Sequence, residues 1–82
     1  MKLSLITPFR KRIVEVAWLE LNTPVGNFVI LHGHAPTILI LSPQKKIYFC
    51  LSSGKQESFS VHRGIAEINR ENTTILLDEE IS

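Results

Sequence analysis

The sequence predicts one all-β domain over residues 1–82, a flattened antiparallel β-sandwich of about eight to ten short strands. Along most of the chain, apolar residues recur with a period near two, which is the period of a strand that turns one face inward. Turn residues separate these segments at intervals of about 8 to 12 residues. Helix signals are poor, because no capping residue precedes an apolar stripe with a period of 3.6 residues.

The first half of the chain predicts an opening strand, one long strand and a loop. A short strand around residues 3–5 ends at Pro8. Residues 12–21 are rich in β-branched and large apolar side chains and predict the long strand, with Trp18 packed in the core. Proline and glycine within the segment 22–27 predict a loop.

The second half predicts a meander of strands joined by tight turns. Apolar and polar side chains alternate best over residues 45–51, and a glycine-containing turn leads into a paired strand over residues 56–62. Two further strands are expected at 65–68 and 73–77. Cys50 lies on the opposite face of its strand from Phe49, where we interpret it as a small packing residue.

The composition of the chain indicates which partners and which cellular setting to expect. The net charge of +1 is far from the positive field that nucleic acid requires, so nucleic acid is not an expected partner. A single cysteine forms no internal disulfide, which favours a reducing, intracellular setting. Apolar runs fall short of the roughly 20 residues that cross a bilayer, so we expect membrane association only through another protein.

Three histidines raise the alternative of a small metal-dependent enzyme. His32 and His34 are two residues apart, and an extended backbone would turn both rings to one side, with His62 as a third ligand. Gly33 and Pro36 instead predict a bend that separates the rings. We therefore expect no metal, and expect His34 to hydrogen-bond backbone groups in a turn.

Other signals of catalysis or cofactor binding are weak. No glycine-flanked elbow surrounds the serines near His62, so no catalytic residue is assigned. Gly26 and Gly33 are too far apart for a phosphate-binding loop, and no cofactor is expected. The basic run 10–12 is interpreted as a solvated strand end, and Phe28 as a candidate for an exposed apolar anchor.

Several short motifs occur in a fixed order along nearly the whole chain. The most specific is Gly33-His34-Ala35-Pro36, preceded by Thr23, Gly26 and the pair Ile30-Leu31. The others are Thr7-Pro8, Val16 with Leu19 and Leu21, the segment 61–65, and Ile75-Leu76-Leu77-Asp78. In these motifs the chain resembles the β-sandwich domain of the epsilon subunit of F-type ATP synthases, which is called delta in mitochondria.

The resemblance implies a non-catalytic rotor subunit of the central stalk. Such a subunit links the gamma subunit to the c-ring and couples ion transport to ATP synthesis, with no active site of its own. It implies a peripheral complex at the cytoplasmic face of the bacterial inner membrane, or at the matrix or stroma side in an organelle. A free-standing β-sandwich interaction module is the remaining alternative.

Carried over residue by residue, the resemblance implies two contact surfaces. The surface facing the c-ring would be a loop that includes Gly26, Asn27, Phe28, Val29 and His32. The surface facing gamma would include His34, Ala35, Pro36 and Leu39. Asn27 stands at a position that is often acidic in the family, which implies a weaker contact with a basic c-ring loop.

The chain also departs from the family pattern. Val29 and Arg63 stand where glycine is usual, His32 where proline is usual, and Gln44 in place of the glycine of a Pro-Gly turn. Because such residues tolerate positive φ poorly, we expect local changes in turn shape. Family members usually continue into a helical hairpin beyond the sandwich, and we expect that hairpin's inhibitory role to be missing here.

Overall fold

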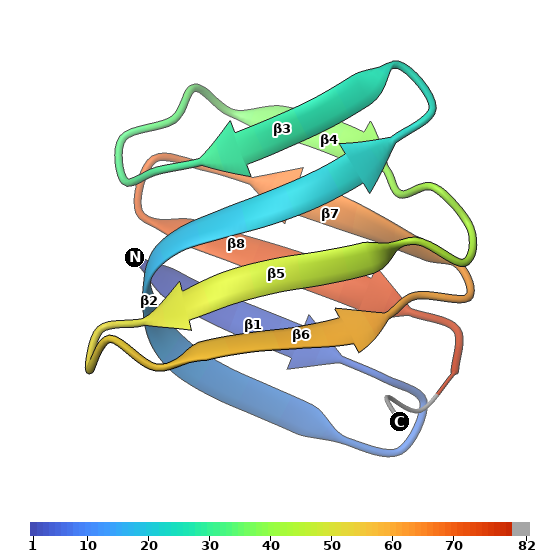
Figure 1. Cartoon of the computed structure of the whole chain (residues 1–82), viewed down its shortest axis with the longest axis horizontal. Helices are drawn as coiled ribbons and strands as arrows, with labels where there is room; N and C mark the ends of the chain where they lie inside the picture. The colour runs from blue at the N-terminus through green and yellow to red at the C-terminus, as the bar shows by residue number, and fades with distance from the viewer. Residues whose placement is uncertain (80–82) are drawn as a thin grey trace.

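The computed structural model describes residues 1–79 and contains eight strands and no helix over that range (Figure 1). No part of the described chain is therefore a helix that could cross a membrane. The strands confirm the predicted all-β sandwich. Their bounds are β1 Lys2–Ile6, β2 Lys11–Thr23, β3 Gly26–Ile30, β4 Thr37–Ile40, β5 Lys46–Leu51, β6 Gln56–Ser60, β7 Gly64–Ile68 and β8 Asn72–Leu77.

The strands form two layers that share the long strand β2. Sheet A has the order β4-β7-β8-β1-β2, and sheet B has the order β3-β2-β5-β6 (Figure 1). The first half of the 13-residue β2 pairs with β1, and its second half pairs with β3 and β5. A register shift between Val16 and Trp18 lies between the two halves, as expected for a bulge that bends a strand from one sheet into the other.

The core fills the space between the two sheets. Within it, Phe49 and Phe59 meet edge to face, with ring centroids 6.1 Å apart. Alternation along each strand supplies the remaining side chains, as period-two patterning requires. The buried cluster consists of Leu3, Leu5, Val16, Leu19, Leu21, Ile30, Leu41, Ile47, Phe49, Phe59, Val61, Ala66, Ile68 and Ile75.

The structure differs from the prediction in how the strands connect. The prediction expected antiparallel pairing throughout. Six of the strand pairs are antiparallel, but β1 and β8 pair in parallel. The predicted meander is wrong at one connection, because β6 lies in sheet B and β7 in sheet A. The predicted loop 22–27 is also wrong: it is a tight hairpin in which β2 continues to Thr23 and β3 begins at Gly26.

The long strand also places its tryptophan differently from the prediction. Trp18 is only half-buried and pairs with Cys50, whereas the next residue, Leu19, is fully buried. Because the bulge interrupts the alternation of β2, Val16 and Leu19 both reach the core although they are three residues apart. The sequence prediction of Trp18 in the core is therefore wrong. Cys50 is buried and lies beside Trp18 on the outer face of sheet B.

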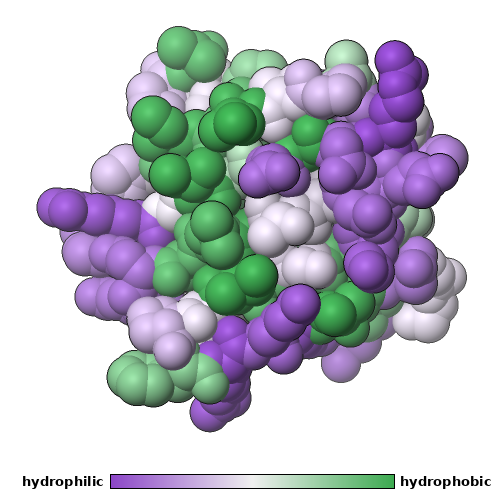
Figure 2. All heavy atoms as spheres, turned by 180° about the vertical axis from the view of Figure 1, so that it is seen from behind, coloured by the Kyte–Doolittle hydropathy of each residue, from purple (hydrophilic) through white to green (hydrophobic). Residues whose placement is uncertain are grey.

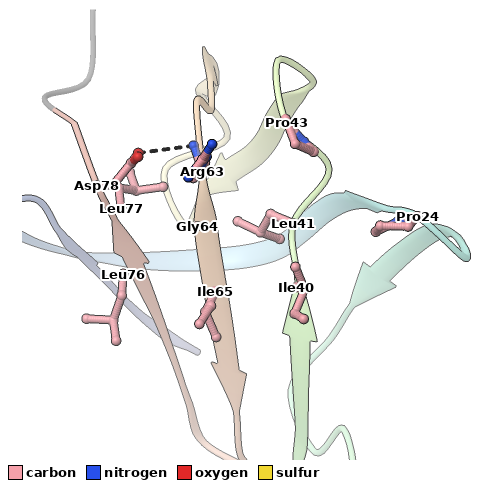
Figure 3. A pocket seen from close by; sticks show the side chains of 10 residues that line it. All are labelled: Pro24, Ile40, Leu41, Pro43, Arg63, Gly64, Ile65, Leu76, Leu77 and Asp78. Carbon is pink, nitrogen blue, oxygen red and sulfur yellow. Dashed lines mark hydrogen bonds between the residues drawn. The ribbon is translucent and has the colours of Figure 1, made fainter.

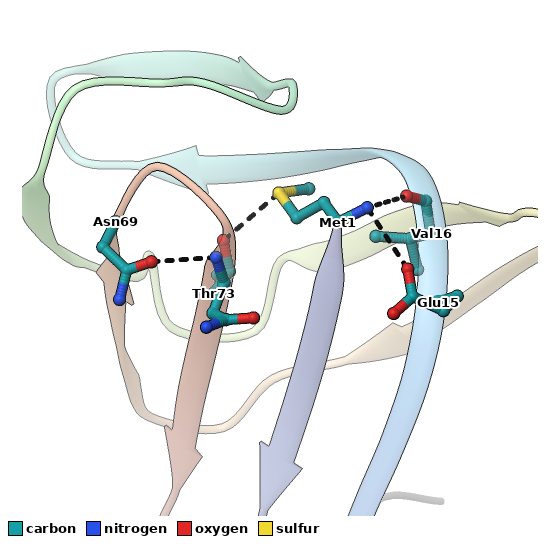
Figure 4. A network of polar contacts seen from close by, with 6 residues as sticks. Met1, Glu15, Val16, Asn69 and Thr73 are labelled. Carbon is teal, nitrogen blue, oxygen red and sulfur yellow. Dashed lines mark hydrogen bonds and ion pairs between the residues drawn. The ribbon is translucent and has the colours of Figure 1, made fainter.

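The first residue of the chain is tied to both neighbouring strands (Figure 4). The amino group of Met1 donates to the carbonyl of Val16 at 3.2 Å and lies 3.3 Å from the carboxylate of Glu15. On the other side, the hydroxyl of the fully buried Thr73 donates to the Met1 sulfur at 3.6 Å. These contacts fix β1 between β2 and β8 at the start of the chain.

Candidate protein–protein interface

The outer face of sheet A carries a contiguous set of aliphatic side chains. The strand register aligns them across four strands: Ile40 opposes Ile65, Ile65 opposes Leu76, and Leu76 opposes Ile6. Aligned residues in neighbouring strands point to the same side of the sheet. With two flanking isoleucines, this set forms what we call the apolar face: Ile6, Ile13, Ile38, Ile40, Ile65 and Leu76.

The apolar face is exposed to a degree that is unusual for grouped aliphatic side chains. Ile38 is 70% exposed and Ile40 is 68% exposed, and both belong to the edge strand β4. Figure 2 shows this side of the molecule, with hydrophobic residues grouped over its middle. Single exposed apolar residues are ordinary, but a contiguous apolar patch marks an interaction surface.

A groove of about 490 Å³ opens at one end of the apolar face (Figure 3). Ile40, Ile65 and Leu76 form one part of its lining, and Pro24 and Pro43 form another. The groove lining is mainly apolar, so it favours an aliphatic or aromatic side chain from a partner.

Gly64, which also lines the groove, has no room for a side chain. A Cβ atom built on Gly64 would lie 2.8 Å from a methyl of Leu77 and 3.1 Å from a methyl of Leu41. Since real Cβ atoms essentially never approach so closely, only glycine fits without moving its neighbours. The close packing of β7 against β8 at the groove therefore depends on the absence of a side chain at position 64.

Arg63 and Asp78 also line the groove, and Asp78 makes polar contacts with neighbouring residues. The Asp78 carboxylate accepts a hydrogen bond from the backbone N–H of Arg63 at 3.1 Å, which Figure 3 shows. Its second oxygen lies 3.0 Å from Nδ1 of His62, and a Glu79 oxygen lies 3.4 Å from the same nitrogen. These contacts hold the end of β8 against the turn between β6 and β7.

An ion pair joins the two sheets on the side away from β3 and β4. Arg12 donates two hydrogen bonds to Glu57, at 3.0 and 2.9 Å, and its guanidinium lies 5.8 Å from the ring centroid of Phe49. The hydrogen bonds to Glu57 raise the pKa of Arg12, and those same bonds lower the pKa of Glu57. Both groups therefore remain charged at neutral pH.

The structure does not bring the three histidines together. Gly33 has a φ of 86°, which confirms the predicted bend between His32 and His34. Nδ1 of His34 lies 2.8 Å from the carbonyl oxygen of Ala35, which confirms the predicted contact with the backbone. The Gly33 N–H donates to the carbonyl of Arg70, in the turn that follows β7. His62 precedes β7, so it lies at the other end of that strand. Among residues 1–79, no group of three metal-ligating side chains is formed.

The expected c-ring surface is distributed along a strand, not around a loop. Gly26, Asn27, Phe28 and Val29 all belong to β3, so the expectation of a loop is wrong for them. Phe28 packs partly buried against the core and is not an exposed anchor, whereas Val29 is 53% exposed on the outer face. His32 follows the opposite end of β3 from Gly26.

The expected gamma surface lies at the start of β4 and in the turn before it. Ala35 and Pro36 are exposed and His34 is half-buried, while a hollow of about 530 Å³ lies beside Pro36 and Ile38. Leu39 faces inward and packs against the core, so it does not belong to an outer surface. The outward residues of β4 are Ile38 and Ile40, which the sequence reasoning did not select.

The substituted turn positions behave differently from one another. Gln44 has a φ of 60°, the one positive φ of a non-glycine residue in the described chain, so it adopts there a backbone conformation that favours glycine. Val29 lies within β3, and neither His32 nor Arg63 has a positive φ. The expected local change in turn shape at these three positions stays a prediction.

Comparison with known proteins identifies the family. The model of the ATP synthase Delta/Epsilon chain, beta-sandwich domain, matches residues 1–82. The ATP synthase epsilon chain of Paracoccus denitrificans is 33% identical over 79 residues, covering 95% of this chain and 53% of that protein. The Rhodobacter capsulatus epsilon chain is 32% identical over 84 residues and is covered to 61% of its length, so this chain spans little more than half of these relatives.

A shorter relative and two solved structures agree with this result. The epsilon chain of Chlorobium limicola is 33% identical over 85 residues, which cover 99% of this chain and 91% of that protein. A chain in the mitochondrial ATP synthase structure of Euglena gracilis matches the fold with a TM-score of 0.84 at 22% identity, covering 98% of this chain and 51% of that chain. A chain in the Tetrahymena thermophila mitochondrial ATP synthase central stalk and c-ring structure matches with a TM-score of 0.82 at 14% identity, covering 96% of this chain and 63% of that chain.

The family model covers every residue, and the two-sheet fold is the β-sandwich that its description states. The chain therefore belongs to the delta/epsilon family of ATP synthase subunits, in which it corresponds to the β-sandwich domain.

Proposed function

We propose that this chain is a non-catalytic rotor subunit of an F-type ATP synthase. In this role it binds the gamma subunit, contacts the c-ring, and helps to couple ion transport to ATP synthesis. Membership of the delta/epsilon family supports the proposal, as do structural matches to chains from ATP synthase assemblies that contain a c-ring. The complex would lie at the cytoplasmic face of a bacterial inner membrane, or at the matrix or stroma side in an organelle.

The observation that carries the proposal is the aligned row of exposed aliphatic side chains on sheet A. Ile40, Ile65 and Leu76 stand side by side on three neighbouring strands at the mouth of the apolar groove. Full burial of such a side chain is worth about 1.5 to 3 kcal/mol, so a partner that covers the row gains several favourable contacts. We assign the apolar face to the gamma subunit, together with His34, Ala35 and Pro36 beside it.

A rotor subunit transmits force through its contacts, so its body must deform little. Here the shared strand β2 links the two sheets, and the Arg12–Glu57 pair joins the first half of β2 to β6, the edge strand of sheet B. Protein interiors are packed as densely as organic crystals, and cross-strand hydrogen bonds resist shear. The sandwich is therefore suited to pass a load from one partner to another without chemistry of its own.

The proposal is tested by co-purification with the gamma subunit encoded in the same genome. We expect the unaltered chain to form a stable complex, and the variant Ile40→Thr/Ile65→Thr to bind about tenfold more weakly or worse. The control Val29→Thr removes an exposed apolar side chain from the outer face of sheet B and should bind normally. Absence of any complex with gamma, or equal losses in both variants, would contradict the proposal.

A further inference from the structure

The outer face of sheet A is not apolar throughout, because three polar side chains cross it beside the aliphatic ones. Glu67 of β7 opposes Thr74 of β8, and Thr74 in turn opposes Ser4 of β1. Aligned residues in neighbouring strands point to the same side of a sheet, so one carboxylate and two hydroxyls lie in line on this face. We call these three residues the polar row.

The polar row is bordered by the apolar face. Ile38 opposes Glu67 at one end of the row, and Ile13 opposes Ser4 at the other end. Along β7, the outward residue next to Glu67 is Ile65, which is 45% exposed. Figure 2 shows paler, less hydrophobic residues among the hydrophobic ones on this side of the molecule. A partner that covers the apolar face would therefore cover Glu67 as well.

The carboxylate of Glu67 has no partner within the part of the chain that the structure describes. The side chain is exposed, and no ion pair or hydrogen bond with another residue of the range 1–79 engages it. Other carboxylates of the chain behave differently, since each of the following three lies against a nitrogen of another residue: Glu15, Glu57 and Asp78. Glu67 is therefore available to a positive group from outside the chain.

The hollow of about 530 Å³ beside Pro36 gives access to this carboxylate. Its lining combines apolar and polar side chains: Pro36, Thr37, Ile38, Glu67, Ile68 and Asn69. Lysine and arginine have an apolar stem and a charged head. A side chain of either type can pack its stem against Ile38 and direct its head to Glu67. The hollow therefore suits a long cationic side chain.

We propose that Glu67 pairs with a lysine or arginine side chain of the gamma subunit, an inference that rests on the proposed function. The half-buried Thr74 beside it adds a hydroxyl that can accept a further hydrogen bond from the same group. A charge that is removed from water without a partner is costly, so a purely apolar surface on gamma would bind poorly over Glu67. The ion pair would also fix one orientation of gamma, which aliphatic contacts alone do not specify.

The test measures the affinity for the gamma subunit encoded in the same genome, and the variant Glu67→Leu decides it by the sign of the change. If a cation of gamma faces Glu67, leucine leaves that cation unpaired in a covered surface and the affinity falls. If no cation is there, leucine enlarges the apolar face and the affinity rises. Glu67→Gln removes the charge at nearly constant size. The matched control Glu71→Leu replaces an exposed carboxylate in the turn between β7 and β8.

We expect the affinity for gamma to fall about tenfold or more in Glu67→Leu, with a smaller loss in Glu67→Gln and none in the control. The affinity should also depend less on NaCl concentration in Glu67→Gln than in the unaltered chain. Thermal unfolding of each variant checks that it is folded.

Two outcomes would overturn the inference while leaving the proposed function in place. One is that Glu67→Leu binds gamma as tightly as the unaltered chain or more tightly, and the other is that Glu71→Leu loses as much affinity as Glu67→Leu. Absence of any complex between gamma and the unaltered chain would instead overturn both the inference and the proposed function.

Discussion

The guanidinium of Arg12 and the carboxylate of Glu57 face each other with two parallel hydrogen bonds, at 3.0 and 2.9 Å, across 45 positions of sequence. Arg12 lies in the half of β2 that belongs to sheet A, and Glu57 lies in β6 at the edge of sheet B. The pair therefore joins the first half of β2, at the edge of sheet A, to the edge strand β6 of sheet B. Its side chains are 47% and 24% exposed, so solvent screens it in part.

This geometry predicts a pH-dependent contribution to stability. The pKa of Glu57 is lowered from its ordinary value of 4.5 by the hydrogen bonds from Arg12. The stability that this pair adds to the folded state is therefore fully present above pH 4.5, and it is lost as the pH falls through the lowered pKa of the folded state. Arg12 has a raised pKa and stays protonated throughout this range. A double-mutant cycle with Arg12→Gln and Glu57→Gln, followed by urea unfolding, should give a coupling of about 1 kcal/mol or less at pH 7.

The same cycle repeated at pH 3 supplies the decisive comparison for this pair. The coupling free energy should shrink, since protonation of Glu57 removes the ion pair. An equal coupling at both pH values would show that the two side chains do not interact as a charged pair.

A second prediction concerns the turn before β5. Gln44 has a φ of 60°, a conformation that costs a residue with a Cβ roughly 1 to 2 kcal/mol. Replacement Gln44→Gly relieves this strain but raises the entropy of the unfolded chain, so we expect a net stabilisation of about 0.5 to 1 kcal/mol. Thermal unfolding measures it. The control Gln56→Gly lies within β6 and should destabilise, and a loss of stability in both variants would contradict the assigned turn conformation.

A third prediction concerns the groove beside the apolar face. In Gly64→Ala the added methyl would lie 2.8 Å from Leu77, 3.0 Å from the Leu76 carbonyl oxygen and 3.1 Å from Leu41. Overpacking of this kind costs about 1 to 3 kcal/mol, so the free energy of unfolding should fall by that amount. Urea unfolding of the purified variant checks it. A variant as stable as the unaltered chain would mean that β7 and β8 pack less closely than the structure shows.

The sequence predicted where the strands lie better than it predicted which strands pair with one another. Alternation of Ile47 and Phe49 with polar neighbours located β5, and the glycine of the following turn, Gly54, has the positive φ of 98° that such a turn uses. The parallel pairing of β1 with β8 could not be read from local pattern, because it joins segments about 70 residues apart. Period-two alternation assigns a face to each side chain but does not specify which strands pair.

Continuous apolar runs explain the errors at the candidate site. In β4 the sequence Thr37-Ile38-Leu39-Ile40 has no charged side chain to mark the outer face, so Leu39 was assigned outward although it packs inward. Trp18 was predicted in the core because its side chain is large and apolar, and the bulge in β2, which local pattern did not reveal, changes which residues of that strand face inward. Ile65 and Leu76 were missed because their proximity to Ile40 arises from pairing between distant strands.

The central claim is that gamma covers the apolar face, and the heat-capacity change of binding tests it most directly. Burial of apolar surface gives a negative heat-capacity change, which titration calorimetry with the gamma subunit at several temperatures measures. We predict a clearly negative value for the unaltered chain and for Val29→Thr, and a smaller magnitude for Ile40→Thr/Ile65→Thr. A value near zero, or one that the substitutions on sheet A leave unchanged, would contradict the claim.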